Sequence, residues 1–262
     1  MSDSPKAVST EIKSAGYAVV TVAREPVNSM NLELWRELAA TLDELEANRE
    51  VHGLILQSGL KRDVFTAGND INELYAPKTS RERYVDFWVT QTTFLARLYR
   101  SRLATVAAIR GASPAGGCVT ALCCDVRIMT DFGNIGLNEV ALGIPVPEYW
   151  GGLMARTIGQ RAAEKLLLNG LLPSSDEALK LGMIDAVVPQ TQLFAAAEDA
   201  IHNLLKAPSA PRAQTKKQLR ATFSKEWEAF GPKEAEGAWP MLASAPVVAA
   251  LGKVLERLSK PK

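Results

Sequence analysis

The amino-acid sequence predicts an α/β protein with a helical C-terminal extension. Short β-branched apolar runs alternate with longer segments in which apolar residues recur every three or four positions, which is typical of strands followed by helices. Apolar residues make up 47% of the 262 residues and charged residues 23%, so general disorder is excluded. A chain of this length holds one large domain, or a domain with an appendage.

The predicted elements follow one another along the chain. We expect strands over residues 17–23, 51–57, 105–109 and 126–129 and helices over 31–48 and 81–101. In the first helix Leu34, Leu38 and Leu42 recur on one face, and Asn31 is a suitable N-cap. Beyond Gly151 we expect mainly helices, over 160–168, 175–181, 193–206 and 212–230, with one strand over 183–188.

The charge balance indicates which partners the chain lacks. Lys and Arg number 30 and Asp and Glu 29, so the net charge of +1 supplies no field for nucleic acid or anionic lipid. The longest uncharged stretch, 16 residues from Gly237 to Gly252, contains two prolines and is too short to cross a bilayer. We therefore expect neither a nucleic-acid partner nor a membrane.

The cysteines, the histidines and the N-terminal residues further limit the class of protein. Cys118, Cys123 and Cys124 fall in one apolar stretch and are expected to be reduced core residues. His52 and His202 are remote from any acidic or cysteine cluster, which disfavours a zinc site or a catalytic triad. The first residues lack the apolar core of a secretory signal and the arginines of a mitochondrial targeting peptide, so we expect a soluble intracellular protein.

Three loops hold the residues suited to chemistry. Residues 65–71 and 111–117 are rich in small residues, which let a backbone approach a ligand and expose its N–H groups. In the second loop Pro114 suits the first turn of a helix, and Gly116 leaves the helix N-terminus open to negative charge. In the third, over 133–144, Glu139 is a lone carboxylate among apolar residues, which favours a raised pKa and proton transfer.

Each loop taken alone also fits ordinary turn and packing chemistry. Neither glycine-rich loop has the Lys-Ser/Thr ending of a P-loop or the GxGxxG pattern of a dinucleotide site. Phosphoryl transfer and hydride transfer therefore lose their usual support, and cofactor-free chemistry through an enolate remains.

In this order and spacing the loops resemble those of the crotonase (enoyl-CoA hydratase/isomerase) superfamily, over about residues 17–189. The matching segments are 65–71, 111–118, 124–128, 142–145, 159–163, 178–182 and 187–189. The resemblance implies a crotonase-like spiral of ββα units over 1–200. It also implies a helical region over 201–262 that covers the CoA site and joins subunits into a homotrimer or a dimer of trimers.

The resemblance also implies the role of each site residue. The backbone N–H groups of Asn69 and Gly116 would bind the thioester oxygen of an acyl-CoA, and Arg24 would lie near the CoA phosphates. Four further residues would line the acyl-CoA path: Ala67, Gly68, Asp70 and Ile71. Coenzyme A is then part of the substrate, and neither a further cofactor nor a metal is implied.

A count of carboxylates narrows the reaction. Hydratases of this superfamily use two glutamates, but Val119 stands at the position of the first, and only Glu139 occupies the second. Segments 26–29, 114–118 and 135–139 are similar to the mitochondrial Δ3,Δ2-enoyl-CoA isomerases. The resemblance implies that Glu139 moves a proton from C2 to C4 of a 3-enoyl-CoA through a dienolate, in β-oxidation of unsaturated fatty acids. It implies the mitochondrial matrix for a eukaryotic protein and the cytoplasm for a bacterial one.

Two alternatives stay open. Another crotonase-type reaction on an acyl-CoA, such as hydration with Asp125 or Glu148 as the second acid, would use the same oxyanion hole. The second alternative is a non-catalytic relative that binds acyl-CoA or RNA. Balanced charge argues against RNA, and the retained Glu139 argues against an inactive enzyme.

Overall fold

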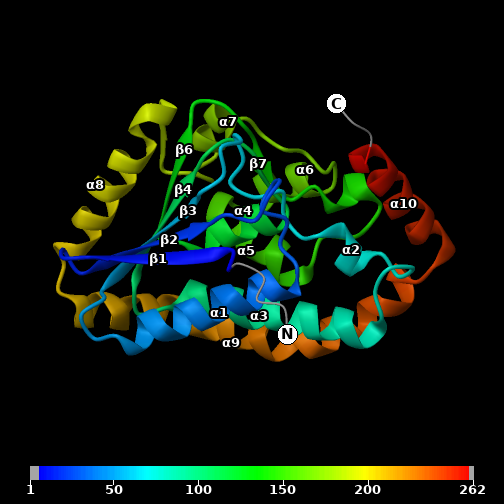
Figure 1. Ribbon diagram of the computed structural model, residues 1–262, viewed down its shortest axis with the longest axis horizontal. Coiled ribbons are helices and arrows are strands. Elements are labelled where there is room, and N and C mark those ends of the chain that lie inside the picture. Colours follow the sequence, from blue (N-terminus) through cyan, green and yellow to red (C-terminus); the bar gives the residue numbers. More distant parts are fainter. Residues whose placement is uncertain (1–5, 260–262) are drawn as a thin grey trace.

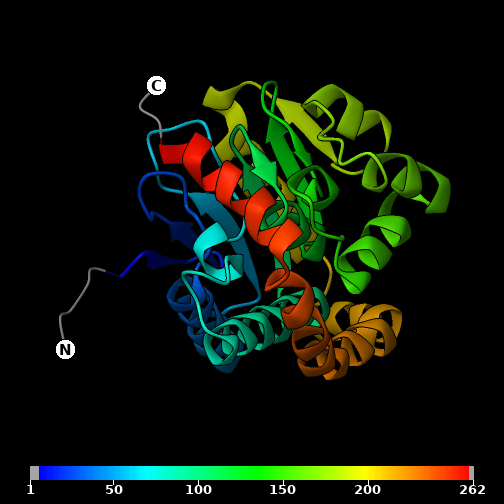
Figure 2. The ribbon, with the colours of Figure 1, turned by 90° about the vertical axis from the view of Figure 1, so that its right-hand side faces the viewer.

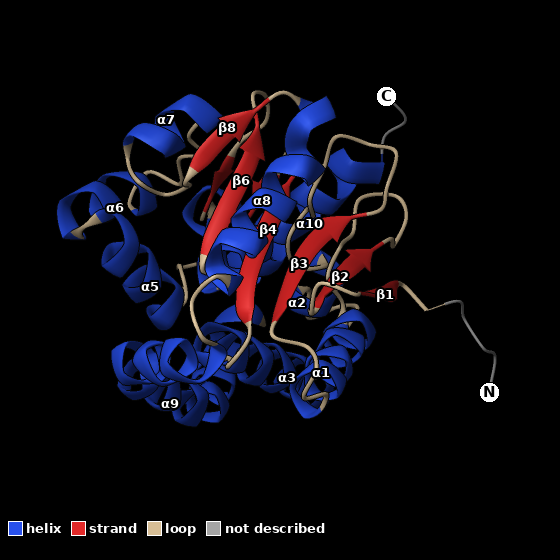
Figure 3. Cartoon of the chain, turned by 90° about the vertical axis from the view of Figure 1, so that its left-hand side faces the viewer, coloured by secondary structure: helices blue, strands red, loops and turns tan. Residues whose placement is uncertain are grey.

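A six-stranded sheet organises the fold. The structure, a computed structural model, describes residues 6–259. The strands lie in the spatial order β1-β2-β3-β4-β6-β8 (Figures 1 and 3). β1 is antiparallel to β2, and all other neighbours are parallel. The strands span Val8–Lys13 (β1), Tyr17–Val22 (β2), Gly53–Ser58 (β3), Ala104–Ile109 (β4), Val126–Thr130 (β6) and Ala186–Val188 (β8).

All five predicted strands are present within a few residues of their expected ends, and one strand of this sheet was missed. β1 escaped prediction because Ser9 to Ile12 are exposed, so it lacks an apolar pattern. As an edge strand that pairs only with β2, it needs no buried face. The last strand begins at Ala186 rather than 183, because Met183 and Ile184 are buried in the turn before it.

Helices cover both faces of the sheet, as Figures 1 and 3 show. On one face α8 (Leu193–Leu205) packs against Val19 and Ile55, and on the other α1 (Leu32–Ala47) and α3 (Arg81–Arg100) pack against Val20 and Leu54. Because both faces are buried, the parallel strands are continuous apolar runs in the sequence. The predicted N-cap of α1 is confirmed, since the side chain of Asn31 accepts a hydrogen bond from the Leu34 N–H.

Two C-terminal helices complete the fold. α9 (Ser209–Leu242) runs alongside α3 and continues through Pro232 and Pro240, so the expected end at 230 was wrong. Close packing of Gly231 on Thr92 of α3 shows why the helix persists: tertiary contact outweighs the local preference. After an 87° bend, α10 (Ala245–Ser259) lies against α2 (Ile71–Leu74) and the 3₁₀ helix η1 (Glu139–Leu142) (Figure 2).

The remaining elements are short. They are β5 (Ser113–Pro114), α4 (Gly116–Cys123), β7 (Ile135–Gly136), α5 (Glu148–Ile158), α6 (Gln160–Leu167), α7 (Ser175–Lys180) and the 3₁₀ helix η2 (Gln190–Gln192). The three cysteines are buried and free, as predicted. In residues 6–259 no individual helix has the length and apolarity to span a bilayer; only the bent pair α9 and α10, taken together, meets both criteria.

Candidate active site

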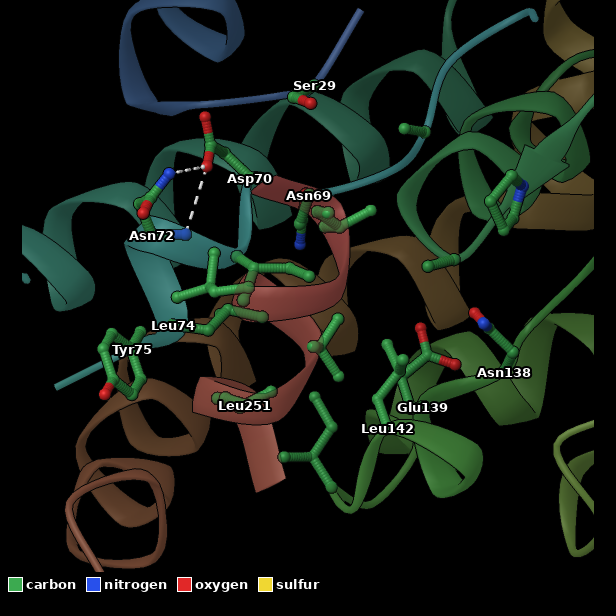
Figure 4. Close-up of a pocket in the computed structure, with 18 of the residues that line it drawn as sticks. Ser29, Asn69, Asp70, Asn72, Leu74, Tyr75, Asn138, Glu139, Leu142 and Leu251 are labelled. Atoms are coloured by element: carbon green, nitrogen blue, oxygen red, sulfur yellow. Dashed lines mark hydrogen bonds between the residues drawn. The ribbon is translucent and has the colours of Figure 1, made fainter. Parts of the chain in front are cut away.

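A cavity of about 1240 Å³ lies between α2, η1, α5, α9 and α10 (Figure 4). Most of the site residues that the sequence predicted line it, namely Arg24, Ala67, Asn69, Asp70, Ile71 and Glu139. The other two, Gly68 and Gly116, do not line the cavity, but they bring its two loops together. The three predicted loops therefore meet at one place in the fold.

The first loop is held in an extended form that leaves one amide free. Met30 donates its N–H to Gly68 O at 2.9 Å, and its own carbonyl accepts the Asp70 N–H at 3.0 Å. Gly68 has φ +83°, a left-handed conformation that suits glycine, and a Cβ there would come within 2.9 Å of Pro114 O. Between these two bonds the N–H of Asn69 has no acceptor among the described residues.

The second loop presents another free amide beside the first. Ala115, with φ 50° and ψ −118°, turns the chain into α4, whose first residue is Gly116. A Cβ on Gly116 would lie 3.2 Å from the Asn69 nitrogen, so the two amides are neighbours. Neither has an intramolecular acceptor among residues 6–259. The N-terminal end of α4 adds positive potential there, so the pair is suited to an oxyanion.

The position of Pro114 differs from the expectation. It was predicted in the first turn of the helix, but it lies in β5, before Ala115 and Gly116. The prediction was wrong because β5 pairs with β7 through Pro114 and Gly136, and the carbonyl of Gly136 then accepts the Ala115 N–H at 2.8 Å. This pairing brings the second loop next to the segment that carries Glu139.

Glu139 is a buried acid without a partner. Its side chain points into the cavity beside Leu142 (Figure 4), the residue is 4% exposed, and neither carboxylate oxygen has a hydrogen-bond donor among the described residues. Desolvation raises the pKa of Glu139 to about 7. A carboxyl group whose pKa is close to neutral pH can take up a proton and return it at the same site.

The two candidate second acids lie in different surroundings, and only one of them lines the cavity of Glu139. Asp125 does not line the cavity; it pairs with Lys216 and Arg220 of α9. Glu148 does line it, but it is the first residue of α5 and exposed, rather than part of a rim loop as expected. Val119 is fully buried in α4 and is absent from the lining of the cavity.

Another acid, Glu234, lines the cavity and was missed by sequence reasoning. It lies in the part of α9 beyond residue 230, where no helix was expected. Both of its oxygens accept hydrogen bonds, from Trp88 Nε1 at 2.9 Å and from the Glu148 N–H at 3.1 Å. In contrast to Glu139, its carboxylate is therefore occupied by protein donors.

Cationic side chains also line the cavity. Arg24 donates to Ser29 O at 2.6 Å and pairs with Asp70 at 3.4 Å, so it is fixed beside the loop. Three further cations that line the cavity were not predicted: Arg62, Lys78 and Arg257. No local motif marks them, because they come from three distant segments of the chain. Guanidinium and ammonium groups are suited to bind an anion such as a phosphate group.

The sheet topology, the paired loop amides and the buried glutamate define an enzyme of the crotonase class. The family described as "Enoyl-CoA hydratase/isomerase" matches residues 12–236, and the chain belongs to this family. The superfamily and the crotonase-like fold predicted from the sequence are thereby confirmed.

Some of the relatives carry isomerase names. Mouse "Enoyl-CoA delta isomerase 1, mitochondrial" is 41% identical over 208 residues, which are 79% of this chain and 71% of the relative. The human protein of that name is 37% identical over 250 residues, 95% of this chain and 82% of the relative. The crystal structure of human mitochondrial delta3-delta2-enoyl-CoA isomerase superposes with a TM-score of 0.92 at 37% identity, covering 97% of this chain and 98% of that one.

Proposed function

We propose that this protein is a Δ3,Δ2-enoyl-CoA isomerase that moves the double bond of a 3-enoyl-CoA to the trans-2 position. The observation that carries the proposal is Glu139, a buried carboxyl group without a hydrogen-bond partner among the described residues, in a cavity that Asn69, with its free amide, also lines. The isomerase names of its relatives support it. The expected place of the reaction is the β-oxidation of unsaturated fatty acids.

One proton moves in two steps. The ionised Glu139 removes a proton from C2, and the C–H electron pair becomes part of a dienolate whose negative charge lies largely on the thioester oxygen. The N–H groups of Asn69 and Gly116 hold that oxygen by hydrogen bonds. The protonated Glu139 then delivers the same proton to C4, the C2–C3 double bond forms, and the carboxylate is restored. No water or second acid is consumed.

The remaining residues bind the CoA part of the substrate. Arg24 and the further cations would bind the phosphates of CoA, and Ala67, Asp70 and Ile71 would contact the pantetheine arm and acyl group, with Gly68 shaping the backbone of their loop. No other cofactor and no metal takes part in this mechanism. From the resemblance to the superfamily we propose a homotrimer or a dimer of trimers as the assembly. The mitochondrial names of the relatives support a location in the mitochondrial matrix for a eukaryotic protein, and the cytoplasm is proposed for a bacterial one.

A direct assay tests the function. Incubation with a 3-enoyl-CoA is expected to produce the conjugated 2-enoyl thioester, detected by its ultraviolet absorbance and by chromatography. A 2-enoyl-CoA offered as substrate separates the alternatives, because a hydratase would convert it to the 3-hydroxy thioester. Hydration that exceeds isomerisation would overturn the proposal, and so would binding of acyl-CoA with neither reaction.

A further inference from the structure

Aromatic side chains from two helices line one part of the cavity. Tyr84 and Trp88 come from α3 and Trp150 from α5, and all three are buried. Trp88 and Trp150 stack with ring centroids 5.8 Å apart and planes 16° apart, and Tyr84 packs on Trp88 at 5.9 Å. Rings stacked in this way form a stiff apolar surface. We call these three side chains the aromatic wall.

Hydrogen bonds to Glu234 connect the aromatic wall to a third helix, α9. Its Oε2 accepts the indole N–H of Trp88 at 2.9 Å, and its Oε1 accepts the N–H of Glu148, the first residue of α5, at 3.1 Å. One carboxylate of α9 therefore joins α3 to α5. Desolvation raises the pKa of Glu234, so these two donors offset part of the cost of its burial.

Apolar and acidic side chains of the cavity lining meet at this junction. The aromatic side chains are buried, Glu234 is half-buried and Glu148 is exposed. An acyl chain would favour the apolar side of this boundary, since moving methylene groups out of water is favourable and moving them against a carboxylate is not. Trp88 cannot give way without losing both its hydrogen bond to Glu234 and its stacking on Trp150.

We infer that the far end of the acyl chain stops against Trp88, which thereby sets the longest acyl chain that the enzyme accepts. The inference rests on the proposed function for the nature of the ligand, an acyl-CoA. Trp88 is then a specificity-determining residue, and Glu234 is a positioning residue that keeps it in place.

Chain-length selectivity is the first test. We compare kcat/KM for 3-hexenoyl-, 3-decenoyl- and 3-hexadecenoyl-CoA in the wild type and in Trp88→Ala. The ratio of the hexadecenoyl to the hexenoyl value is expected to rise at least about tenfold in Trp88→Ala, because each accommodated methylene is worth about tenfold or more in an apolar pocket. A ratio equal to that of the wild type would overturn the inference.

Variants of Glu234 test the positioning role. Glu234→Ala is expected to raise the same kcat/KM ratio, but by less than Trp88→Ala. Glu234→Gln is expected to keep the ratio close to that of the wild type, because its carbonyl oxygen can still accept the indole N–H. The matched control is Glu236→Ala, which removes an exposed carboxylate of the same helix that pairs with Arg81. A shift in Glu236→Ala as large as in Glu234→Ala would refute the positioning role.

A binding measurement keeps the inference separate from catalysis and from folding defects. Saturated acyl-CoA esters with a terminal bromine quench indole fluorescence on contact and cannot be isomerised. Bromodecanoyl-CoA is expected to quench the wild type, to quench Trp88→Phe less, and to quench the core control Trp35→Phe as strongly as the wild type. Equal quenching of Trp88→Phe would overturn the inference. Quenching that follows this pattern without isomerisation would instead refute only the proposed function.

Discussion

The backbone nitrogen of Asn69 lies 3.2 Å from the point that a Cβ on Gly116 would occupy, and the side-chain oxygen of Asn69 lies 3.0 Å from it. Two loops that are far apart in the sequence thus approach so closely that only glycine leaves the space between them open. Gly116 has no left-handed φ, so its lack of a side chain matters for this close approach and not for backbone conformation.

This relationship makes Gly116→Ala an informative variant. The added methyl group would push the Asn69 loop away and misalign one of the two amides, and loss of one oxyanion donor typically costs about 10²- to 10³-fold in kcat. We expect kcat to fall by about 10²-fold while the melting temperature stays within a few degrees. The control is Gly237→Ala in α9, where a Cβ meets nothing within 4 Å. Full activity in Gly116→Ala would exclude an oxyanion role for this pair.

Replacement of the base tests the proton transfer. Glu139→Gln keeps the shape of the side chain but removes the group that accepts the proton, so isomerisation is expected to fall by about 10²- to 10⁴-fold. Stability should not fall, because neither oxygen of Glu139 has a partner to lose. Steady-state kinetics and urea unfolding measure the two effects, with exposed Glu148→Gln as the matched control. Near wild-type isomerisation by Glu139→Gln would mean that another group is the base.

The raised pKa of Glu139 predicts opposite effects of pH on activity and stability. Only the ionised form accepts a proton, so kcat/KM for isomerisation should rise with pH through about 7 and then level off. The folded state holds this proton more tightly than the unfolded chain, whose glutamate has its ordinary pKa of 4.5. Stability is therefore lost as pH rises between these two values.

Comparison of the wild type with Glu139→Gln isolates that loss. Glu139→Gln lacks the titrating group, so its free energy of unfolding relative to the wild type should increase between about pH 4.5 and pH 7, by about 3 kcal/mol, and stay constant above. Urea denaturation at a series of pH values measures it. A difference between the two proteins that does not change with pH would show that Glu139 is not desolvated in solution.

The fold was predictable where the pattern of side chains is local. The runs around Val19 and Ile55 are apolar because α-helices cover both faces of the sheet, and this is visible in the sequence itself. β1 was not predictable because an edge strand can be polar on its exposed side. The full length of α9 was not predictable either, since Pro232 breaks the local pattern and only packing against α3 keeps the helix continuous.

In the candidate site, too, residues marked by their local sequence were predictable and residues brought together by the fold were not. Asn69, Gly116 and Glu139 each lie in a short segment whose own residues mark it: small residues near a free amide, or an acid among apolar neighbours. Trp88 and Glu234 are 146 residues apart, and nothing in either segment indicates that they meet. Their contact depends on the packing of α3, α5 and α9, which is a property of the whole fold.

Asp125, considered from the sequence as a second acid, instead anchors α9 to the sheet. Lys216 is buried and donates to the Asp125 carboxylate and to Leu103 O, both at 2.9 Å, while Arg220 pairs with Asp125 at 2.8 Å. Burial alone would raise the pKa of Asp125, but the two cations hold this pKa below its ordinary value. Burial also lowers the pKa of Lys216. Asp125 therefore stays ionised and has no proton to donate.

This arrangement predicts a loss of stability rather than a loss of chemistry. Asp125→Asn leaves the charge of Lys216 buried without its counter-charge, so the free energy of unfolding is expected to fall by about 3 to 5 kcal/mol. The double variant Asp125→Asn/Lys216→Met should recover much of it, because it removes both charges together. Urea unfolding measures the stability, and kcat per folded molecule at low temperature should match the wild type in both variants. A large loss of kcat in a stably folded Asp125→Asn would instead assign this carboxylate to catalysis.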